Sequence, residues 1–202
     1  MKKFISALSL CFFSFASLAS GKIDNDKKTI ISTVESHRDR LIEISDKIWE
    51  AAEPALLEFK SSKYLSDYAE ENGFRVTLGV ADIPTAFVAE YGSGKPIIGI
   101  LGEFDANPGI SQKKQATKEP LVKGAAGHGC GHNLFGTASL GAAIAIKEMI
   151  ESGEISGTVR FYGTPAEETI FAKVWMVRAG LFDDLDVCMD WHPGDEIEAS
   201  TQ

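Results

Sequence analysis

The sequence predicts an α/β fold in which helices flank a largely parallel sheet, and two observations lead to it. Short apolar segments of strand type alternate with segments of helical periodicity along most of the chain, which is typical of a sheet built from βαβ units. Residues 96–101, Pro-Ile-Ile-Gly-Ile-Leu, are apolar without interruption, as expected for a strand covered on both faces. With 202 residues, 44% of them hydrophobic, the chain can bury the core of one domain.

The first twenty residues differ in composition from the rest of the chain. Lys2 and Lys3 precede a Phe-rich apolar run, and Ser17-Leu18-Ala19 fits a small-residue cleavage site. We therefore expect residues 1–19 to be a signal peptide and the protein to be exported, periplasmic or secreted, with the fold in residues 20–202. No later segment is long enough to span a membrane, and the formal charge of -9 argues against a nucleic-acid partner.

The remaining elements follow from periodicity and from turn residues. Apolar residues recur at helical spacing from Lys27 to about Ala52, and a second helix is expected to stop at Gly73. Small residues such as Gly136 and Gly141 should let a later helix pack closely on the sheet. The predicted helices are 27–52, 61–72, 134–150 and 172–179, and the predicted strands are 74–78, 86–91, 96–101, 158–162 and 186–191. A long polar loop, 106–123, precedes the most informative segment.

That segment, residues 124–143, places Cys130 and His132 where a Gly-rich loop runs into a helix. A thiolate and an imidazole two positions apart suit a transition metal, and the neighbouring glycines let the backbone turn both side chains toward one point. A disulfide between Cys130 and Cys188 is the alternative in an oxidising compartment. Cys188 also reads as a small core residue in an apolar strand.

Further ligand-type residues follow the ends of three predicted strands. Glu103 and Asp105 follow the strand at 96–101, Glu167 and Glu168 follow the strand at 158–162, and His192 follows the strand at 186–191. Open α/β sheets place ligands at the carboxyl ends of their strands, so these side chains should face one crevice. Carboxylate, thiolate and imidazole collected there would form a metal centre.

Each of these residues also has a structural interpretation. Thr164-Pro165-Ala166-Glu167 fits a capping box with proline at the first helical position, and Glu168 would then complement the helix dipole. Glu103 and Asp105 fit ordinary turn residues, and His192 fits a strand-end histidine satisfied by backbone. What favours the metal centre is that four such clusters are unexpected in a purely structural domain.

Two other histidines carry less information. His37 lies among charged residues on what reads as a solvated helix face, and we assign it no role. His128 is left open as a ligand, as a partner of a ligand or as a loop residue.

At these residues the chain resembles the M20 metallopeptidases. The resemblance is to the amidohydrolase branch, which includes aminoacylases, N-acyl-amino-acid hydrolases and aminobenzoyl-glutamate hydrolases. That branch has an acidic D-A-x-P segment, then H-x-C-G-H, then P-A-E-E, then a strand-end histidine. The corresponding residues here are 104–108, Phe-Asp-Ala-Asn-Pro; 128–132, His-Gly-Cys-Gly-His; 165–168, Pro-Ala-Glu-Glu; and 190–193, Asp-Trp-His-Pro.

The resemblance implies a role for each matched position. Cys130, His132, Glu168 and His192 would hold one or two divalent ions: zinc, manganese or cobalt. Glu167 would be the general base, and Asp105 would orient a ligand or the base. The implied reaction is hydrolysis of an amide bond in a small N-acyl amino acid or an aminobenzoyl-glutamate-like substrate, with water activated by the ion.

The resemblance also implies a zinc-exopeptidase-like catalytic domain that is incomplete here. Members of the family are considerably longer, insert a lid domain after the strand that carries the His192 equivalent, and homodimerise through it. We therefore expect residues 20–202 to be the N-terminal part of such a domain. Two other functions stay open: a non-catalytic exported metal- or partner-binding domain, and a purely structural α/β domain with a Cys130–Cys188 disulfide.

Overall fold

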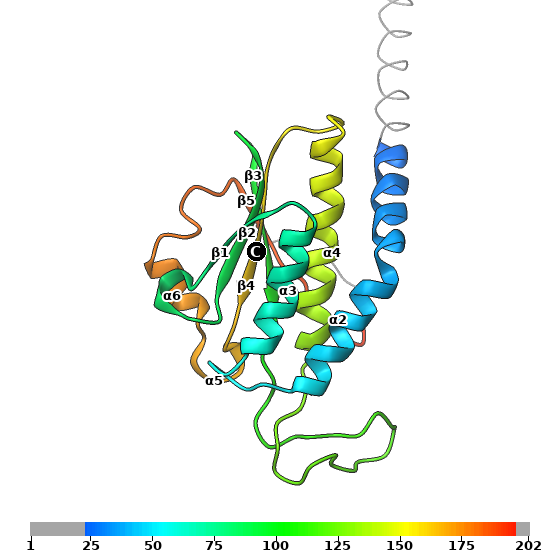
Figure 1. Cartoon of the computed structure of the whole chain (residues 1–202), viewed down its shortest axis with the longest axis vertical. Coiled ribbons are helices and arrows are strands. Elements are labelled where there is room, and N and C mark those ends of the chain that lie inside the picture. The colour runs from blue at the N-terminus through cyan, green and yellow to red at the C-terminus, as the bar shows by residue number, and fades with distance from the viewer. Residues whose placement is uncertain (1–22, 197–202) are drawn as a thin grey trace, which may run out of the picture.

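A computed structural model describes residues 23–196 and contains one five-stranded sheet with the order β1-β2-β4-β3-β5 (Figure 1). The strands are β1 (Arg75–Leu78), β2 (Phe87–Ser93), β3 (Ile97–Glu103), β4 (Gly157–Thr164) and β5 (Val187–Met189). All five lie where strands were predicted. The predicted signal peptide lies outside the described residues and stays a prediction.

The sheet is mixed rather than uniformly parallel. β3 pairs in parallel with β4 and β5, whereas β2 pairs antiparallel with β1 and β4. The link between β1 and β2 holds only the short 3-10 helix η1 (Val80–Asp82), and so short a link cannot return the chain for a parallel pairing. The α/β class with flanking helices is confirmed, and its β4-β3-β5 half is parallel.

Helices cover the two faces of the sheet unequally. α2 (Arg38–Ala51), α3 (Phe59–Glu71) and α4 (His132–Glu151) lie together on one side, and α6 (Lys173–Arg178) lies on the other, after the short α5 (Glu167–Ile170) (Figure 1). The larger core cluster joins α2, α3 and α4 to inward residues of the sheet such as Phe87 and Phe161. α4 packs closely because a Cβ on Gly136 would lie 2.6 Å from the carbonyl oxygen of Glu103.

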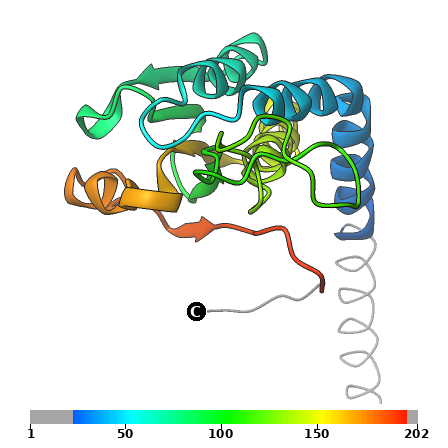
Figure 2. The ribbon, with the colours of Figure 1, turned by 90° about the horizontal axis from the view of Figure 1, so that it is seen from below.

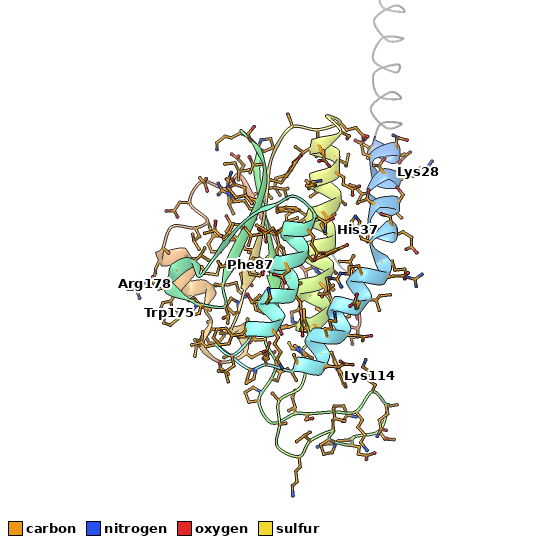
Figure 3. All side chains as sticks on the ribbon, viewed as in Figure 1. Lys28, His37, Phe87, Lys114, Trp175 and Arg178 are labelled. Atoms are coloured by element: carbon orange, nitrogen blue, oxygen red, sulfur yellow. The ribbon has the colours of Figure 1, made fainter. Side chains whose placement is uncertain are left out.

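The first predicted helix is interrupted at His37. Residues 23–36 are helical, and α2 starts anew after His37, its N-cap residue. The interpretation of His37 as solvated is wrong, because its Nδ1 lies 2.5 Å from Tyr68 Oη and its Nε2 lies 3.2 Å from Glu148 Oε1. Figure 3 shows His37 where α2 runs past the neighbouring helices. The flanking charges in the sequence concealed this partly buried contact.

The two cysteines in the described part of the chain, Cys130 and Cys188, are both free thiols, so the disulfide alternative is wrong. Cys188 is exposed rather than part of the core, because β5 is an edge strand whose three residues are all exposed. Among the described residues, no helix combines the length and the apolar character needed to cross a membrane.

One carboxyl group lies entirely inside the protein. Glu58 is fully buried, and it accepts hydrogen bonds from the Thr85 hydroxyl (3.1 Å) and the Ala166 backbone N–H (2.9 Å). Burial raises the pKa of Glu58 to about 7, since removal from water disfavours the charged form.

This shift predicts a pH-dependent stability. The folded state retains the Glu58 proton more strongly than the unfolded state, so stabilisation is complete below pH 4.5 and is lost as pH rises through about 7. In the wild type, titration of Glu58 should lower the free energy of unfolding by about 3 kcal/mol over this interval. Glu58→Gln cannot titrate and should not show this decrease. Denaturant titrations of both proteins at several pH values measure it. If the free energy of unfolding of E58Q changed between acid and neutral pH as much as that of the wild type, the assignment would be contradicted.

Candidate metal centre

The three predicted polar clusters meet at one edge of the sheet. β3 ends at Glu103, β4 ends at Thr164 just before α5, and β5 is followed by His192. These strands are parallel, so their carboxyl ends share an edge. Figure 2, which looks at the molecule from below, shows the loop 106–123 in green at this end, between the α2 side and the α6 side.

His132 is the central residue of the cluster. It is the first residue of α4, it is fully buried, and it follows Gly131, which has a φ of 83° that favours glycine. Its Nδ1 lies 3.0 Å from Asp105 Oδ1. A carboxylate at that nitrogen fixes the orientation of the ring and directs Nε2 toward the site.

Three glutamates surround the Nε2 atom of His132. Glu103 Oε2 is 2.9 Å away, Glu168 Oε1 is 3.7 Å away and Glu167 Oε2 is 4.0 Å away. One oxygen each from Glu103 and Glu167 and a nitrogen of His132 lie within 4.8 Å of one another. His132 thus faces both glutamates of the predicted Pro-Ala-Glu-Glu motif.

Cys130 and His192 form a second group around the same histidine. Cys130 Sγ lies 3.2 Å from His192 Nε2, and ligand atoms of both residues lie within 4.8 Å of one in His132. Three predicted ligands from two distant segments are therefore gathered, with the fourth, Glu168, beside His132. The Cys130 backbone is held by Asn107, whose Oδ1 accepts the N–H groups of Gly129 and Cys130 at 3.1 Å.

The segment that carries His192 is held against α4. Trp191 donates its indole N–H to Ser139 Oγ at 3.1 Å, and Phe135 packs edge-on against both Trp191 and His192. His192 Nδ1 lies 2.9 Å from its neighbour's carbonyl oxygen, on Pro193. The expected backbone contact is therefore present, and the opposite ring nitrogen is left to face Cys130.

The capping-box interpretation of residues 164–167 is wrong. Thr164 donates its hydroxyl to the carbonyl of Gly102 instead of capping α5. The N-cap is Ala166, with a φ of 58° and no side-chain cap. The Glu168 N–H instead donates to Asp105 Oδ2 at 2.9 Å. The local pattern was consistent with a cap, but β4 continues through Thr164 and uses its side chain within the sheet.

Glu103 and Asp105 are not turn residues at the surface. Both are buried, at 6% and 1% exposed, and Glu103 forms an ion pair with Lys173. Sequence reasoning missed Lys173, since only the packing of α6 against the end of β3 brings it to the site. It also missed Asn107, although its place in the acidic D-A-x-P segment was a usable signal.

The electrostatics of the cluster raise three pKa values. Burial lowers the pKa of His132, but its contacts with Asp105 and Glu103 outweigh this and raise it to about 10. Burial and the neighbouring Glu168 raise the pKa of the Cys130 thiol to about 11. Burial, followed by the charge of Glu103, raises the pKa of Glu167. A divalent cation and protons therefore compete for the Cys130 and His132 positions.

Two buried polar atoms fit a cation. Glu168 Oε1 is inaccessible and has no hydrogen-bond partner among the described residues, although such atoms are normally paired. The equally inaccessible His132 Nε2 faces carboxylate oxygens, the nearest on Glu103 at 2.9 Å. Both are potential metal donors, and Cys130 and His192 lie beside them. A mixed sulfur, nitrogen and oxygen donor set suits zinc and similar ions. Cys130, His132, Glu168 and His192 could thus hold a metal, and Glu103 and Glu167 lie close enough to His132 to take part.

His128 stabilises the loop and is not part of either ligand group. Its Nε2 lies 3.1 Å from the Ile48 carbonyl oxygen, so it ties the loop to α2. Burial lowers the pKa of His128 to about 4 and keeps the ring neutral. The loop is anchored again by Lys114, which lies at the end of α2 in Figure 3, 3.0 Å from Asp46 and over the Trp49 ring.

Comparison with known proteins places this geometry in a family. Residues 99–200 match the family described as Peptidase family M20/M25/M40. The chain is 47% identical over 165 residues to a p-aminobenzoyl-glutamate hydrolase subunit of Escherichia coli, covering 81% of this chain and 34% of that protein. It is 26% identical over 164 residues to N-acetylcysteine deacetylase of Bacillus subtilis, covering 80% and 42%.

A solved structure agrees with the sequence relatives. A dinuclear metal-binding peptidase of the M20 family from Bacillus subtilis superposes with a TM-score of 0.65 and 26% identity, covering 76% of this chain and 42% of that one. The chain thus spans between a third and a half of the length of each of these three proteins. The resemblance to the M20 metallopeptidases is confirmed, and the chain belongs to peptidase family M20/M25/M40.

Proposed function

We propose that this chain carries the metal-binding and proton-transfer residues of a hydrolase that cleaves the amide bond of N-acyl or aminobenzoyl amino acids. The observation that carries the proposal is the position of Glu167, which lies with Glu103 beside His132 but outside the Cys130–His132–His192 group. The names of the relatives support the substrate class. p-Aminobenzoyl-glutamate and N-acetylcysteine are both amides between an acyl group and an amino acid.

The neighbouring glutamates suit different tasks. Glu168 turns an unpartnered, buried oxygen toward His132, as a metal ligand would. Glu167 keeps 30% of its side chain exposed, so water and substrate can reach it. A bound divalent ion would polarise the amide carbonyl and lower the pKa of the attacking water.

Glu167 supplies the proton transfers in this proposal. Its carboxylate takes a proton from the attacking water and later returns it to the nitrogen of the departing amine, so the group ends as it began. The raised pKa of Glu167 makes it a stronger base than an ordinary carboxylate and brings it closer to neutral pH, where such transfer is efficient. Asp105 holds His132 and the Glu168 backbone while this happens.

The raised pKa values of Cys130 and His132 predict that metal binding releases protons. Both groups must lose a proton to bind a cation, so the affinity for Zn²⁺ or Mn²⁺ should increase from pH 6 to pH 8. Calorimetry in buffers of different ionisation enthalpy counts the released protons. His37→Gln alters a partly buried histidine outside the site and should leave the count unchanged. Binding without proton release would contradict the ligand assignment.

Glu167→Gln should abolish turnover while metal remains bound. Loss of the base is expected to lower kcat at least about 100-fold, with an unchanged metal content. Hydrolysis of p-aminobenzoyl-glutamate and N-acetylcysteine is measured for the chain alone and mixed with the separately expressed remainder of the E. coli relative. The exposed Glu154 provides the control E154Q.

Three outcomes of that assay discriminate between interpretations. The proposal is supported if the wild type and E154Q hydrolyse the substrate and E167Q does not. Loss of metal in E167Q would contradict the separation between base and ligand. Metal binding without hydrolysis in any mixture would contradict an amidohydrolase and favour a non-catalytic metal-binding domain.

A further inference from the structure

Glu58 occupies an unusual place for a buried carboxylate. It is the N-cap residue of α3, yet its side chain does not cap that helix. The cap is supplied by Glu53, whose carboxylate accepts the backbone N–H groups of Lys60 and Ser61. Glu58 is thereby free to turn inward, where it is fully buried. Burying a carboxylate is costly, so its partners inside the protein decide what it does.

One of those partners, Ala166, lies at the turn that presents the glutamates of the site, and the other, Thr85, lies just before β2. Glu58 Oε1 accepts the N–H of Ala166 at 2.9 Å, and its Oε2 accepts the hydroxyl of Thr85 at 3.1 Å. Ala166 has a φ of 58°, in the left-handed region that disfavours a residue with a Cβ. The hydrogen bond that Ala166 donates to a buried carboxylate helps to hold this residue in a conformation that it would otherwise leave.

Asp105 holds the same turn from its other side. Its Oδ2 accepts the N–H of Glu168 at 2.9 Å, while its Oδ1 faces His132. The backbone N–H groups on both sides of Glu167 are thus held by carboxylates from distant segments. Glu58 comes from the start of α3, and Asp105 comes from the end of β3. No ion pair of Glu58 occurs within the described residues, and besides these hydrogen bonds only the backbone of Leu56 and of Glu58 itself hydrogen-bonds the carboxyl group there.

We propose that Glu58 is a positioning residue that fixes the turn at Ala166, and through it the directions of Glu167 and Glu168 toward the metal centre. Glu58 touches neither of these side chains and acts through the backbone. The inference rests on the proposed function for the role of Glu167, but it also concerns Glu168 and metal binding, which can be measured without hydrolysis. A carboxylate that only stabilised the fold would not change metal affinity selectively.

The test compares two substitutions that differ in the acceptor. Glu58→Leu removes both hydrogen bonds at similar volume, whereas Glu58→Gln keeps an oxygen that accepts from Ala166. We expect E58L to bind Zn²⁺ about 10- to 100-fold more weakly than wild type, the range found when groups that orient metal ligands are lost, and E58Q to stay within about threefold. In an active mixture, kcat should fall in E58L with little change in KM.

Glu53→Leu is the matched control. It removes a carboxylate that also accepts backbone N–H groups, at the same helix start but away from α5. E53L should lower the melting temperature while Zn²⁺ affinity is retained. Equal Zn²⁺ affinity in E58L and wild type, or equal losses in E58L and E58Q, would overturn the proposal.

Thr85→Val keeps the inference testable if E58L does not fold. It removes only the hydroxyl that holds Glu58 Oε2, and it should weaken Zn²⁺ binding severalfold. Unchanged Zn²⁺ affinity in T85V would then overturn the proposal. Absence of hydrolysis in the wild type would refute the proposed function but leave these affinity comparisons decisive.

Discussion

The carboxylate of Asp105 holds together three segments that the sheet brings to one edge. It follows β3, faces the Nδ1 atom of His132 at the start of α4, and accepts the backbone N–H of Glu168 in α5. Asp105 is 1% exposed and His132 is fully buried, so water does not weaken these contacts. The Asp105 carboxylate thus orients the His132 ring and also holds the backbone at Glu168. The geometry of the site depends on these two hydrogen bonds of Asp105 more than on any other contact.

The cost of this arrangement is an excess of negative charge in a buried place. Ion-pair contacts around the site join His132 to four carboxylates, among them Glu103 and Asp105, while Lys173 adds a contact to Glu103. A protonated His132 balances part of the charge, which explains its raised pKa. A divalent cation would balance more of it and would give the buried Glu168 Oε1 a partner. The same electrostatics would therefore underlie both the competition with protons and the proposed binding of a cation.

Much of the fold could be predicted because its signals are local. The strands, and the close packing of α4 through Gly136, follow from apolar runs and small residues. The clustering of polar residues at strand ends followed from one rule about parallel strands. Features that depend on strand order or side-chain direction could not be read in this way. Cys188 is exposed because β5 is an edge strand, and His37 faces inward because its helix breaks there. Nothing in the sequence near Glu58 indicates that its side chain turns toward Ala166.

The central claim, that sulfur, imidazole and carboxylate groups bind one centre, is tested most directly by optical spectroscopy of the Co²⁺-loaded protein. A cobalt ion bound by the Cys130 thiolate gives a sulfur-to-metal charge-transfer band in the near ultraviolet, in addition to its visible bands. The account predicts this band in the wild type and in Cys188→Ser. In Cys130→Ser the band should be absent, while cobalt still binds, with lower affinity. A Co²⁺ spectrum without the band, or one that Cys130→Ser leaves unchanged, would contradict it.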